Sequence, residues 1–366
     1  MPQRAIVIRS PHAGRSEKLV EAIAHLEQTG VEVVNTISVA DLDNLPAQGT
    51  TWKEGGIDVA IAAGGDGLVG GVITHIAESG LPLGILPLGT SNDIARALRI
   101  PQDLQAAAQT IAQGKLQEVD IGVAQSAEEA PHLATQHQSG PLLEQVAPQK
   151  RGYFAHALTV GVNVQFARIA TDVATRQRFG RMTYTIAALE TFVTHDVLDI
   201  QLVFEGLAMP QPTANSQVHM SPATPELQTS LRGRALQVAV INTPIFGGQR
   251  ELAIPGSSFA DRLLDIVMIE QMDVGTLGKN IVHNFGPKGH AGTPVSTGEK
   301  RTFTHHPAEF SGIPGIHHVQ ARGVTITTNA DPRDVTLDGE VRGQTPMYVH
   351  VADEQLRVKV PEQALR

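Results

Sequence analysis

Hydrophobic positions in the first 122 residues form short apolar runs that alternate with amphipathic segments. The runs have the length and composition of buried strands, and they fall at 5–8, 31–34, 57–63 and 83–86. Apolar side chains recur at helical spacing over 17–28 and 68–79, which predicts helices there. Strands that alternate with helices favour a parallel sheet with helices on both of its faces.

After residue 120 the apolar runs continue without regular helices between them. The predicted strands are 153–164, 197–204, 235–242, 263–270, 319–328 and 346–351, with one helix over 183–193. This succession favours a mostly antiparallel β-sandwich. Three polar stretches are expected to be exposed insertions, and they cover 125–150, 209–230 and 284–315.

The chain of 366 residues is long for one hydrophobic core, so these two patterns predict two domains. We expect an α/β domain over 1–122 and a β-sandwich domain over 123–351. The last segment, 352–366, is expected to pack back on the first domain.

The third apolar run ends in the loop Gly64-Gly65-Asp66-Gly67, which opens a predicted helix. Backbone N–H groups at such a helix start can approach phosphate oxygens, and glycine leaves the approach clear. A tight structural connection is the alternative interpretation of these four residues. The loop is therefore a candidate nucleotide site with Asp66 at its centre.

A second loop, 87–93, follows the fourth apolar run and also leads into a predicted helix. Its polar residues are all suitable helix N-caps: Thr90, Ser91, Asn92 and Asp93. Gly89, Thr90 and Asn92 are equally suited to contact a nucleotide. Because parallel strands share one carboxyl edge, the loops that begin at Ser10, Gly64 and Pro87 should meet there.

The net charge of the chain limits how it could bind a nucleotide. The net charge of −9 argues against a general binder of nucleic acid or anionic membranes. Residues 1–122 carry 8 Lys and Arg against 14 Asp and Glu, a net of −6. Backbone N–H groups, a divalent metal and a few local cations must therefore hold a triphosphate, and the candidate cations are Arg9, Arg15 and Lys18.

The chain contains no cysteine, which excludes a disulfide framework, a thiol nucleophile and cysteine metal ligands. This composition fits a reducing compartment. The start of the chain does not resemble a signal peptide, and no uncharged apolar run approaches membrane-spanning length.

The loops 64–67 and 87–93 together resemble the catalytic domain of diacylglycerol and sphingosine kinases. Further segments resemble that family in the same order along the chain: 10–14, 118–122, 242–248, 261–265 and 337–340. The resemblance implies a Rossmann-like, phosphofructokinase-like α/β domain followed by an antiparallel β-sandwich. It also implies an interdomain cleft in which ATP and Mg²⁺ act on a lipid alcohol, most simply diacylglycerol.

The resemblance further implies a cytoplasmic enzyme that meets its lipid at a membrane surface or as an extracted monomer, with a homodimer as one expected assembly. Three positions depart from the family motifs. Leu68 stands where a small hydroxyl residue is usual, Ser10 replaces an asparagine, and Arg262 replaces a glycine. Ser10 and Arg15 remain candidate nucleotide contacts beside the first strand.

Asp338-Gly339-Glu340 has two interpretations. Asp-Gly is a strong hairpin-turn signal, whereas a spacing of two on an extended strand would aim both carboxylates to the same side. The resemblance implies that Asp66, Asp338 and Glu340 are the carboxylates of the cleft. Glu340 is the favoured general base and Asp66 its rival.

Two metal sites are expected. Asp66 and Asp120 would share the catalytic Mg²⁺ and its water, although Asp120 could instead be a solvated or capping carboxylate. The resemblance implies a structural Mg²⁺ at Asp261 and Asp265, held by carboxylates and backbone carbonyls, which are the ligands that a hard cation prefers.

The leading functional hypothesis is an ATP-dependent lipid kinase. An NAD kinase is the alternative within enzymes, because it shares the Gly-Gly-Asp-Gly loop and a two-domain plan. A catalytically weakened lipid-binding or regulatory protein is the alternative of a different class, suggested by Leu68 and Ser10.

Overall fold

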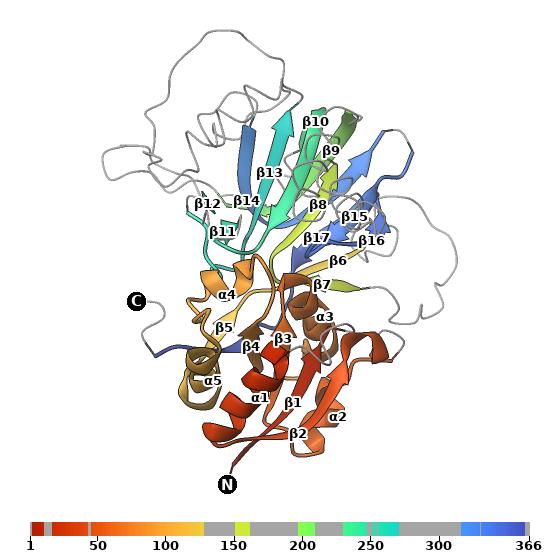
Figure 1. Ribbon diagram of the computed structural model, residues 1–366. Coiled ribbons are helices and arrows are strands. Elements are labelled where there is room, and N and C mark those ends of the chain that lie inside the picture. The colour runs from red at the N-terminus through yellow and green to blue at the C-terminus, as the bar shows by residue number, and fades with distance from the viewer. Residues whose placement is uncertain are drawn as a thin grey trace, which may run out of the picture.

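The computed structural model describes ten stretches of the chain: 2–10, 17–42, 45–127, 151–161, 197–208, 230–246, 252–254, 256–270, 316–329 and 331–362. These stretches form an α/β domain and a β domain, one above the other in Figure 1. Among the described residues no helix is long and apolar enough to cross a membrane.

The α/β domain is built on a six-stranded sheet with the order β2-β1-β3-β4-β18-β5. The bounds are β1 Gln3–Arg9, β2 Val31–Ser38, β3 Val59–Gly64, β4 Leu83–Pro87, β5 Lys115–Val119 and β18 Leu356–Val360. The first four strands are parallel, β18 pairs parallel to β4, and β5 runs antiparallel to β18 at the edge.

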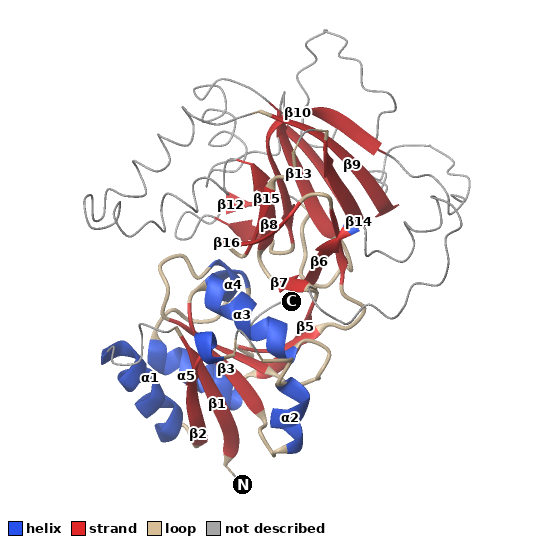
Figure 2. Cartoon of the chain, turned by 90° about the vertical axis from the view of Figure 1, so that its right-hand side faces the viewer, coloured by secondary structure: helices blue, strands red, loops and turns tan. Residues whose placement is uncertain are grey.

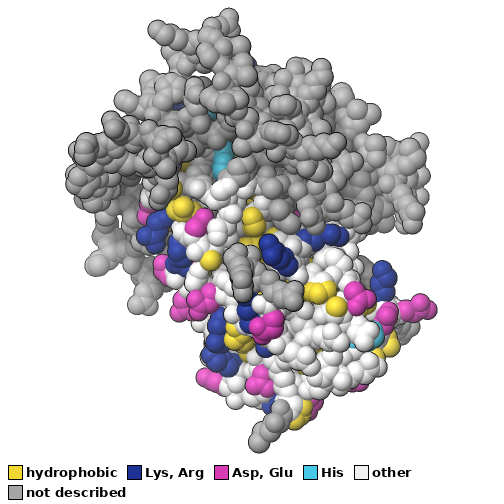
Figure 3. Space-filling model, turned by 90° about the vertical axis from the view of Figure 1, so that its left-hand side faces the viewer, with side chains coloured by type: hydrophobic (Ala, Val, Ile, Leu, Met, Phe, Trp, Pro, Cys, Tyr) yellow, Lys and Arg dark blue, Asp and Glu magenta, His cyan; other side chains and the backbone are white. Residues whose placement is uncertain are grey.

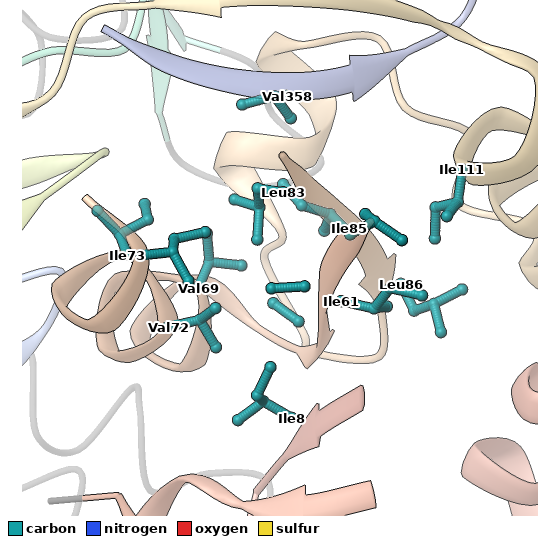
Figure 4. Packing of buried hydrophobic residues seen from close by; sticks show 14 of the residues in the cluster. Ile8, Ile61, Val69, Val72, Ile73, Leu83, Ile85, Leu86, Ile111 and Val358 are labelled. Carbon is teal, nitrogen blue, oxygen red and sulfur yellow. The ribbon is translucent and has the colours of Figure 1, made fainter. Parts of the chain in front are cut away.

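Helices cover both faces of this sheet. Their bounds are α1 Glu17–Gln28, α2 Gly49–Glu54, α3 Asp66–Ile76, α4 Asp93–Ala97 and α5 Leu104–Gln113, with a 3₁₀ turn over Val39–Asp41. In Figure 4 Val69, Val72 and Ile73 of α3 lie on one side of the central strands, and Ile111 of α5 lies on the other. Every residue of β3 and β4 is buried, as expected for parallel strands covered on both faces.

The β domain contains a ten-stranded sheet. Its strands are β6 Gly122–Ser126, β7 Gly152–Phe154, β8 Ala157–Gly161, β9 Leu198–Leu207, β10 Ser230–Ile241, β13 Leu264–Glu270, β14 Ile316–Thr328, β15 Asp334–Leu337, β16 Glu340–Gln344 and β17 Met347–Val351. A separate pair joins β11 Ile245–Phe246 to β12 Leu252–Ala253.

Two long strands fold this sheet over on itself. Both β10 and β14 pair antiparallel with β13 along one part of their length and with β9 along another. The two layers enclose a second core that includes Phe154, Phe204 and Val240, each at most 2% exposed. This arrangement confirms the predicted fold class, a parallel α/β domain followed by an antiparallel β-sandwich.

Several element predictions needed correction. The predicted strand over 153–164 is wrong as one strand, because the chain bends at Ala155-His156 between β7 and β8. The periodicity missed α2, α5 and β18. The predicted helix over 183–193 lies outside the described residues, as do 128–150, 209–229 and 284–315 of the expected insertions.

The chain crosses between the domains at two described places. The first crossing joins β5 to β6 through residues 120–121, and the second joins β17 to β18 through residues 352–355. In Figures 1 and 2, α3 and α4 lie at the top of the α/β domain, on the side turned toward the β domain.

Candidate active site

The strands β1, β3 and β4 end side by side at one edge of the parallel sheet. Arg9 of β1 pairs with Ala63, and Gly64 of β3 pairs with Pro87, so these strands end side by side. Ser10 lies at this edge and is half-buried, whereas Arg15 lies outside the described residues. On the face shown in Figure 3, acidic and basic side chains of the α/β domain are interspersed, which agrees with local rather than bulk attraction of an anion.

The two glycine loops touch each other through their backbones. A Cβ atom on Gly65 would lie 3.2 Å from the Gly89 Cα, and a Cβ atom on Gly89 would overlap Gly65. Gly64 is pressed in turn against the side chain of Leu68, which fills the space behind the loop. These glycines therefore allow the 64–67 and 87–93 loops to form one surface.

Asp66 ties the second loop to the first. Its Oδ2 accepts the Asp93 backbone N–H at 3.1 Å, and its Oδ1 accepts the Ile94 N–H at 3.0 Å. The carboxylate thus caps α4 from another element, a role usually filled by the residue that precedes the helix. The Asp66 carboxylate is consequently held toward α4.

Asn92 organises the second loop from inside. Its Oδ1 accepts the Gly89 N–H at 3.0 Å, and its Nδ2 donates to the Gly89 carbonyl oxygen at 3.0 Å and to Gln102 Oε1 at 3.1 Å. Asn92 is 6% exposed and has a positive φ of 51°. Gly89 and Thr90 are exposed and therefore accessible from solvent, whereas the Asn92 side chain is not.

The N-terminus of α3 has no side-chain cap, whereas Asp103 caps α5. The first N–H groups of a helix have no acceptor within the helix, and together with the helix dipole they attract anions. A Cβ atom on Gly67, in this first turn, would lie 3.5 Å from Glu340 Oε1 of the β domain. The structure therefore brings the glycine loop and Glu340 together.

Glu340 is exposed and paired with a neighbour on its own strand. Its Oε2 accepts from Arg342 Nη2 at 2.6 Å and from Arg342 Nε at 3.1 Å. The position of Glu340 beside Gly67 leaves it accessible to an acceptor hydroxyl. Its role as general base stays a prediction.

Asp338 and Glu340 both lie against α3, Asp338 against Gly70 and Glu340 against Gly67. Asp338 and Gly339 have φ values of 47° and 88° and form the two-residue turn between β15 and β16. The expectation of an extended strand through Asp338 is therefore wrong. The Asp338 carboxylate instead accepts the backbone N–H groups of Ala155, His156 and Ala157 at 2.9 to 3.0 Å.

Burial of Asp338 changes its acidity. A Cβ atom on Gly70 of α3 would lie 2.5 Å from Asp338 Oδ2, so the carboxylate rests directly on this helix. Burial raises the pKa of Asp338 to about 6, although the charge of His156 and the three N–H groups act in the opposite direction. Asp338 thus joins the turn, the bend at 155–157 and the helix of the glycine loop.

His156 is a residue of this region that the sequence patterns missed. Its Nε2 lies 3.6 Å from Asp93 Oδ2 at the start of α4, and its Nδ1 lies 2.7 Å from Thr243 Oγ1. A second contact between the domains joins the Tyr153 hydroxyl to Glu78 Oε1 at 2.8 Å. His156 lies within a predicted apolar strand, and no motif in the sequence marks it.

A second group of carboxylates surrounds Asp261, which lies near Asp120 and Asp265. Asp120 Oδ2 accepts the Arg262 backbone N–H at 2.7 Å, and its Oδ1 accepts from Gln355 Nε2 at 2.9 Å. Burial, together with the charges of Asp265 and Asp120, raises the pKa of Asp261 to about 6, although its hydrogen bond from the Leu263 N–H acts in the opposite direction. Asp120 is therefore a buried carboxylate that holds the loop before β13, and its expected role as a metal ligand stays a prediction.

These carboxylates do not fit the structural cation that the resemblance implies. Asp265 Oδ1 lies 2.6 Å from His318 Nε2 and accepts from Gln320 Nε2 at 3.0 Å. Arg262 Nη1 lies 3.4 Å from Asp120 Oδ1. In the part of the chain that the structure describes, no three acidic or histidine side chains are grouped to hold a metal ion.

Two family descriptions match the chain. Residues 4–124 match the diacylglycerol kinase catalytic domain, and residues 156–286 match the YegS C-terminal NAD kinase beta sandwich-like domain. The fold and these matches define a kinase, that is, a phosphotransferase with an alcohol acceptor. The chain therefore combines a diacylglycerol kinase catalytic domain with a YegS C-terminal NAD kinase beta sandwich-like domain.

Relatives resemble the chain over most of its length. A diacylglycerol kinase of Staphylococcus saprophyticus is 24% identical over 351 residues, which cover 94% of this chain and 92% of that protein. A diacylglycerol kinase of Staphylococcus aureus is also 24% identical, with 94% and 89% covered.

A solved structure described as a diacylglycerol kinase from Bacillus anthracis superposes with a TM-score of 0.59 at 17% identity. The superposition covers 100% of this chain and 99% of the Bacillus anthracis chain. A second chain from that organism superposes with a TM-score of 0.64, also at 17% identity and with the same coverage. At this identity the structures show a shared fold.

Proposed function

We propose that this protein transfers the γ-phosphate of ATP to the hydroxyl of a lipid alcohol, diacylglycerol or a close analogue. One observation carries the proposal: Gly67, at the uncapped N-terminus of α3, lies against Glu340 of the other domain. A phosphate cradle and a carboxylate are the two protein groups that phosphoryl transfer to an alcohol requires beside a metal. The names of the Staphylococcus relatives support diacylglycerol as the acceptor.

The phosphates would lie on the surface formed by the two loops. The N–H groups of the first turn of α3 would face the phosphate oxygens, and exposed Gly89 and Thr90 would contact the nucleotide from the other side. Asp66 would position α4 and Asn92 would shape its loop, since both side chains are directed inward. Ser10 would border the site from the end of β1.

The catalytic Mg²⁺ expected with ATP requires only one or two protein carboxylates, because phosphates and water supply its other ligands. Asp66, next to Gly67 in the chain, fits this requirement, because each of its oxygens accepts only one N–H group and keeps a lone pair for the metal. When bound, the metal would neutralise charge on the transferred phosphate. Asp120 is unsuited to this metal, because it is 0% exposed and its carboxylate is directed at Arg262 and Gln355.

Glu340 would accept the proton of the lipid hydroxyl. It is exposed at the domain boundary, whereas both oxygens of its rival Asp66 accept N–H groups of α4. Arg342 would orient the Glu340 carboxylate toward Gly67 through its two hydrogen bonds.

The proposed activity is tested by incubating the protein with γ-labelled ATP, Mg²⁺ and one acceptor at a time. Diacylglycerol in mixed micelles, other lipid alcohols and NAD form the panel. We expect label in phosphatidic acid. Label in NADP would establish the NAD kinase alternative, and nucleotide or lipid binding without transfer would establish the weakened binding protein.

Gly65→Val should abolish ATP binding while the protein stays folded. The new side chain would separate the two loops, because even a Cβ atom would lie 3.2 Å from Gly89 Cα. Isothermal titration calorimetry measures the affinity, and circular dichroism checks the fold. Gly233→Ala in β10 is the control, since its Cβ atom would make an ordinary 3.5 Å contact with Met268. Wild-type ATP affinity in Gly65→Val would refute the phosphate site.

A further inference from the structure

The two places where the chain crosses between the domains are joined by one side chain, that of Arg262. The first crossing contains Asp120, whose Oδ1 lies 3.4 Å from Arg262 Nη1. The second contains Asp353, whose carbonyl oxygen accepts from Arg262 Nη2 at 2.9 Å. Arg262 itself lies in the loop before β13. Its guanidinium therefore joins this loop to both crossings, which are distant from it in sequence.

Asp120 needs a cationic partner. It is 0% exposed, and a buried carboxylate without compensation is strongly unfavourable. Its Oδ2 accepts the Arg262 backbone N–H at 2.7 Å, so backbone and side chain of the same residue hold both of its oxygens. Gln355, also in the second crossing, donates to Oδ1 at 2.9 Å but carries no charge.

The backbone of Arg262 has adopted a conformation that disfavours an arginine. Its φ is +63°, a left-handed value that glycine adopts without strain and other residues adopt at a cost. Arginine at this position is therefore explained by what its side chain does. A planar guanidinium can donate to two partners at once, as it does here to Asp120 and the Asp353 carbonyl.

We propose that the Arg262 guanidinium is the resident cation of this junction, in place of the structural metal ion that the family resemblance implies. It binds both crossings to the loop before β13 and fixes the β domain on the α/β domain. The junction is therefore stable without a divalent metal. This role is independent of the proposed kinase activity.

The test compares Arg262→Gly with Arg99→Gly by thermal unfolding of the full chain without nucleotide. Arg99 also has a positive φ, 56°, and is exposed, so glycine relieves the same backbone strain there. Arg99→Gly should leave the melting temperature unchanged or raise it. Arg262→Gly should lower it by roughly 5 °C or more, because the buried Asp120 carboxylate loses its cationic partner. A melting temperature for Arg262→Gly at or above that of the wild type would overturn the proposal.

Metal dependence is the second measurement. The wild-type melting temperature should be the same in EDTA and in excess Mg²⁺. A rise with Mg²⁺ that Asp261→Asn removes would place a metal at the junction and overturn the proposal.

If Arg262→Gly does not yield folded protein, the melting temperatures of Arg262→Lys and Arg262→Gln test whether the positive charge is required. Lysine keeps the charge and glutamine keeps only hydrogen-bonding capacity, so the lysine variant should melt at the higher temperature. Equal melting temperatures would show that the charge is not required.

Discussion

Glu340→Gln should lower turnover by about 100-fold or more, the usual scale for the loss of a general base. Glutamine keeps the size and hydrogen-bonding capacity of the side chain but cannot take the proton of the acceptor hydroxyl. ATP affinity and melting temperature should change little, because Glu340 is exposed and its pair with Arg342 is a surface ion pair, worth about 0–1 kcal/mol.

The measurement is the initial rate of phosphate transfer at saturating ATP and lipid, with calorimetry for ATP binding. Glu54→Gln is the matched control, since Glu54 is an exposed glutamate at the end of α2. It should behave as the wild type. A fully active Glu340→Gln enzyme would move the base role to Asp66 and leave residues 338–340 with a structural role.

Asp338→Ala should cost about 3 kcal/mol or more of folding free energy at neutral pH. The change leaves the buried N–H group of Ala155 and the part-buried N–H groups of His156 and Ala157 without an acceptor, at about 1–3 kcal/mol for each buried donor. Part of this loss is offset because the variant no longer buries a charge. Denaturant titration measures the free energy of unfolding.

Asp338→Asn separates the charge of Asp338 from its hydrogen bonds. Asparagine retains one acceptor oxygen and tolerates the positive φ of 47°. It should therefore be more stable than Asp338→Ala. Equal stability of the two variants would show that the three N–H groups do not depend on residue 338.

The raised pKa of Asp338 also predicts that the free energy of unfolding depends on pH. The pKa of Asp338 is raised by burial from 3.8 to about 6, so between these values the folded protein retains a proton that the unfolded chain releases. This contribution to stability is fully present below pH 4 and is lost as the pH rises through 6. Asp338→Asn should lack it. The difference between the wild-type and Asp338→Asn unfolding curves isolates it from Asp261, whose pKa is raised in the same direction.

Local patterns were sufficient for much of the α/β domain. The helix predicted over 17–28 is α1, Glu17–Gln28. It could be predicted because apolar residues three and four positions apart along the chain already define its buried face. The glycine loops were found for a similar reason, since each follows a buried strand directly along the chain. The sequence therefore predicted the carboxyl edge at which β1, β3 and β4 end side by side and from which the Gly64 and Pro87 loops leave.

The same local information could not choose between the two interpretations of 338–340. The Asp-Gly turn signal was correct for the backbone, and Glu340 nevertheless reaches the glycine loop. Both hold because the turn sends Asp338 inward to residues 155–157 and leaves Glu340 beside Gly67. That outcome depends on a contact that spans 183 positions of the chain.

The sequence by itself determined the two-domain order, the parallel strands and the identity of the glycine loops, since each is encoded by residues close together along the chain. Only the tertiary structure decided the partners of the charged side chains. Asp66 caps α4, His156 faces Asp93, and Arg262 joins Asp120 to the Asp353 carbonyl. The physical reason is that a buried charge takes whichever partner the fold brings within hydrogen-bonding distance, and no spacing along the chain records that distance.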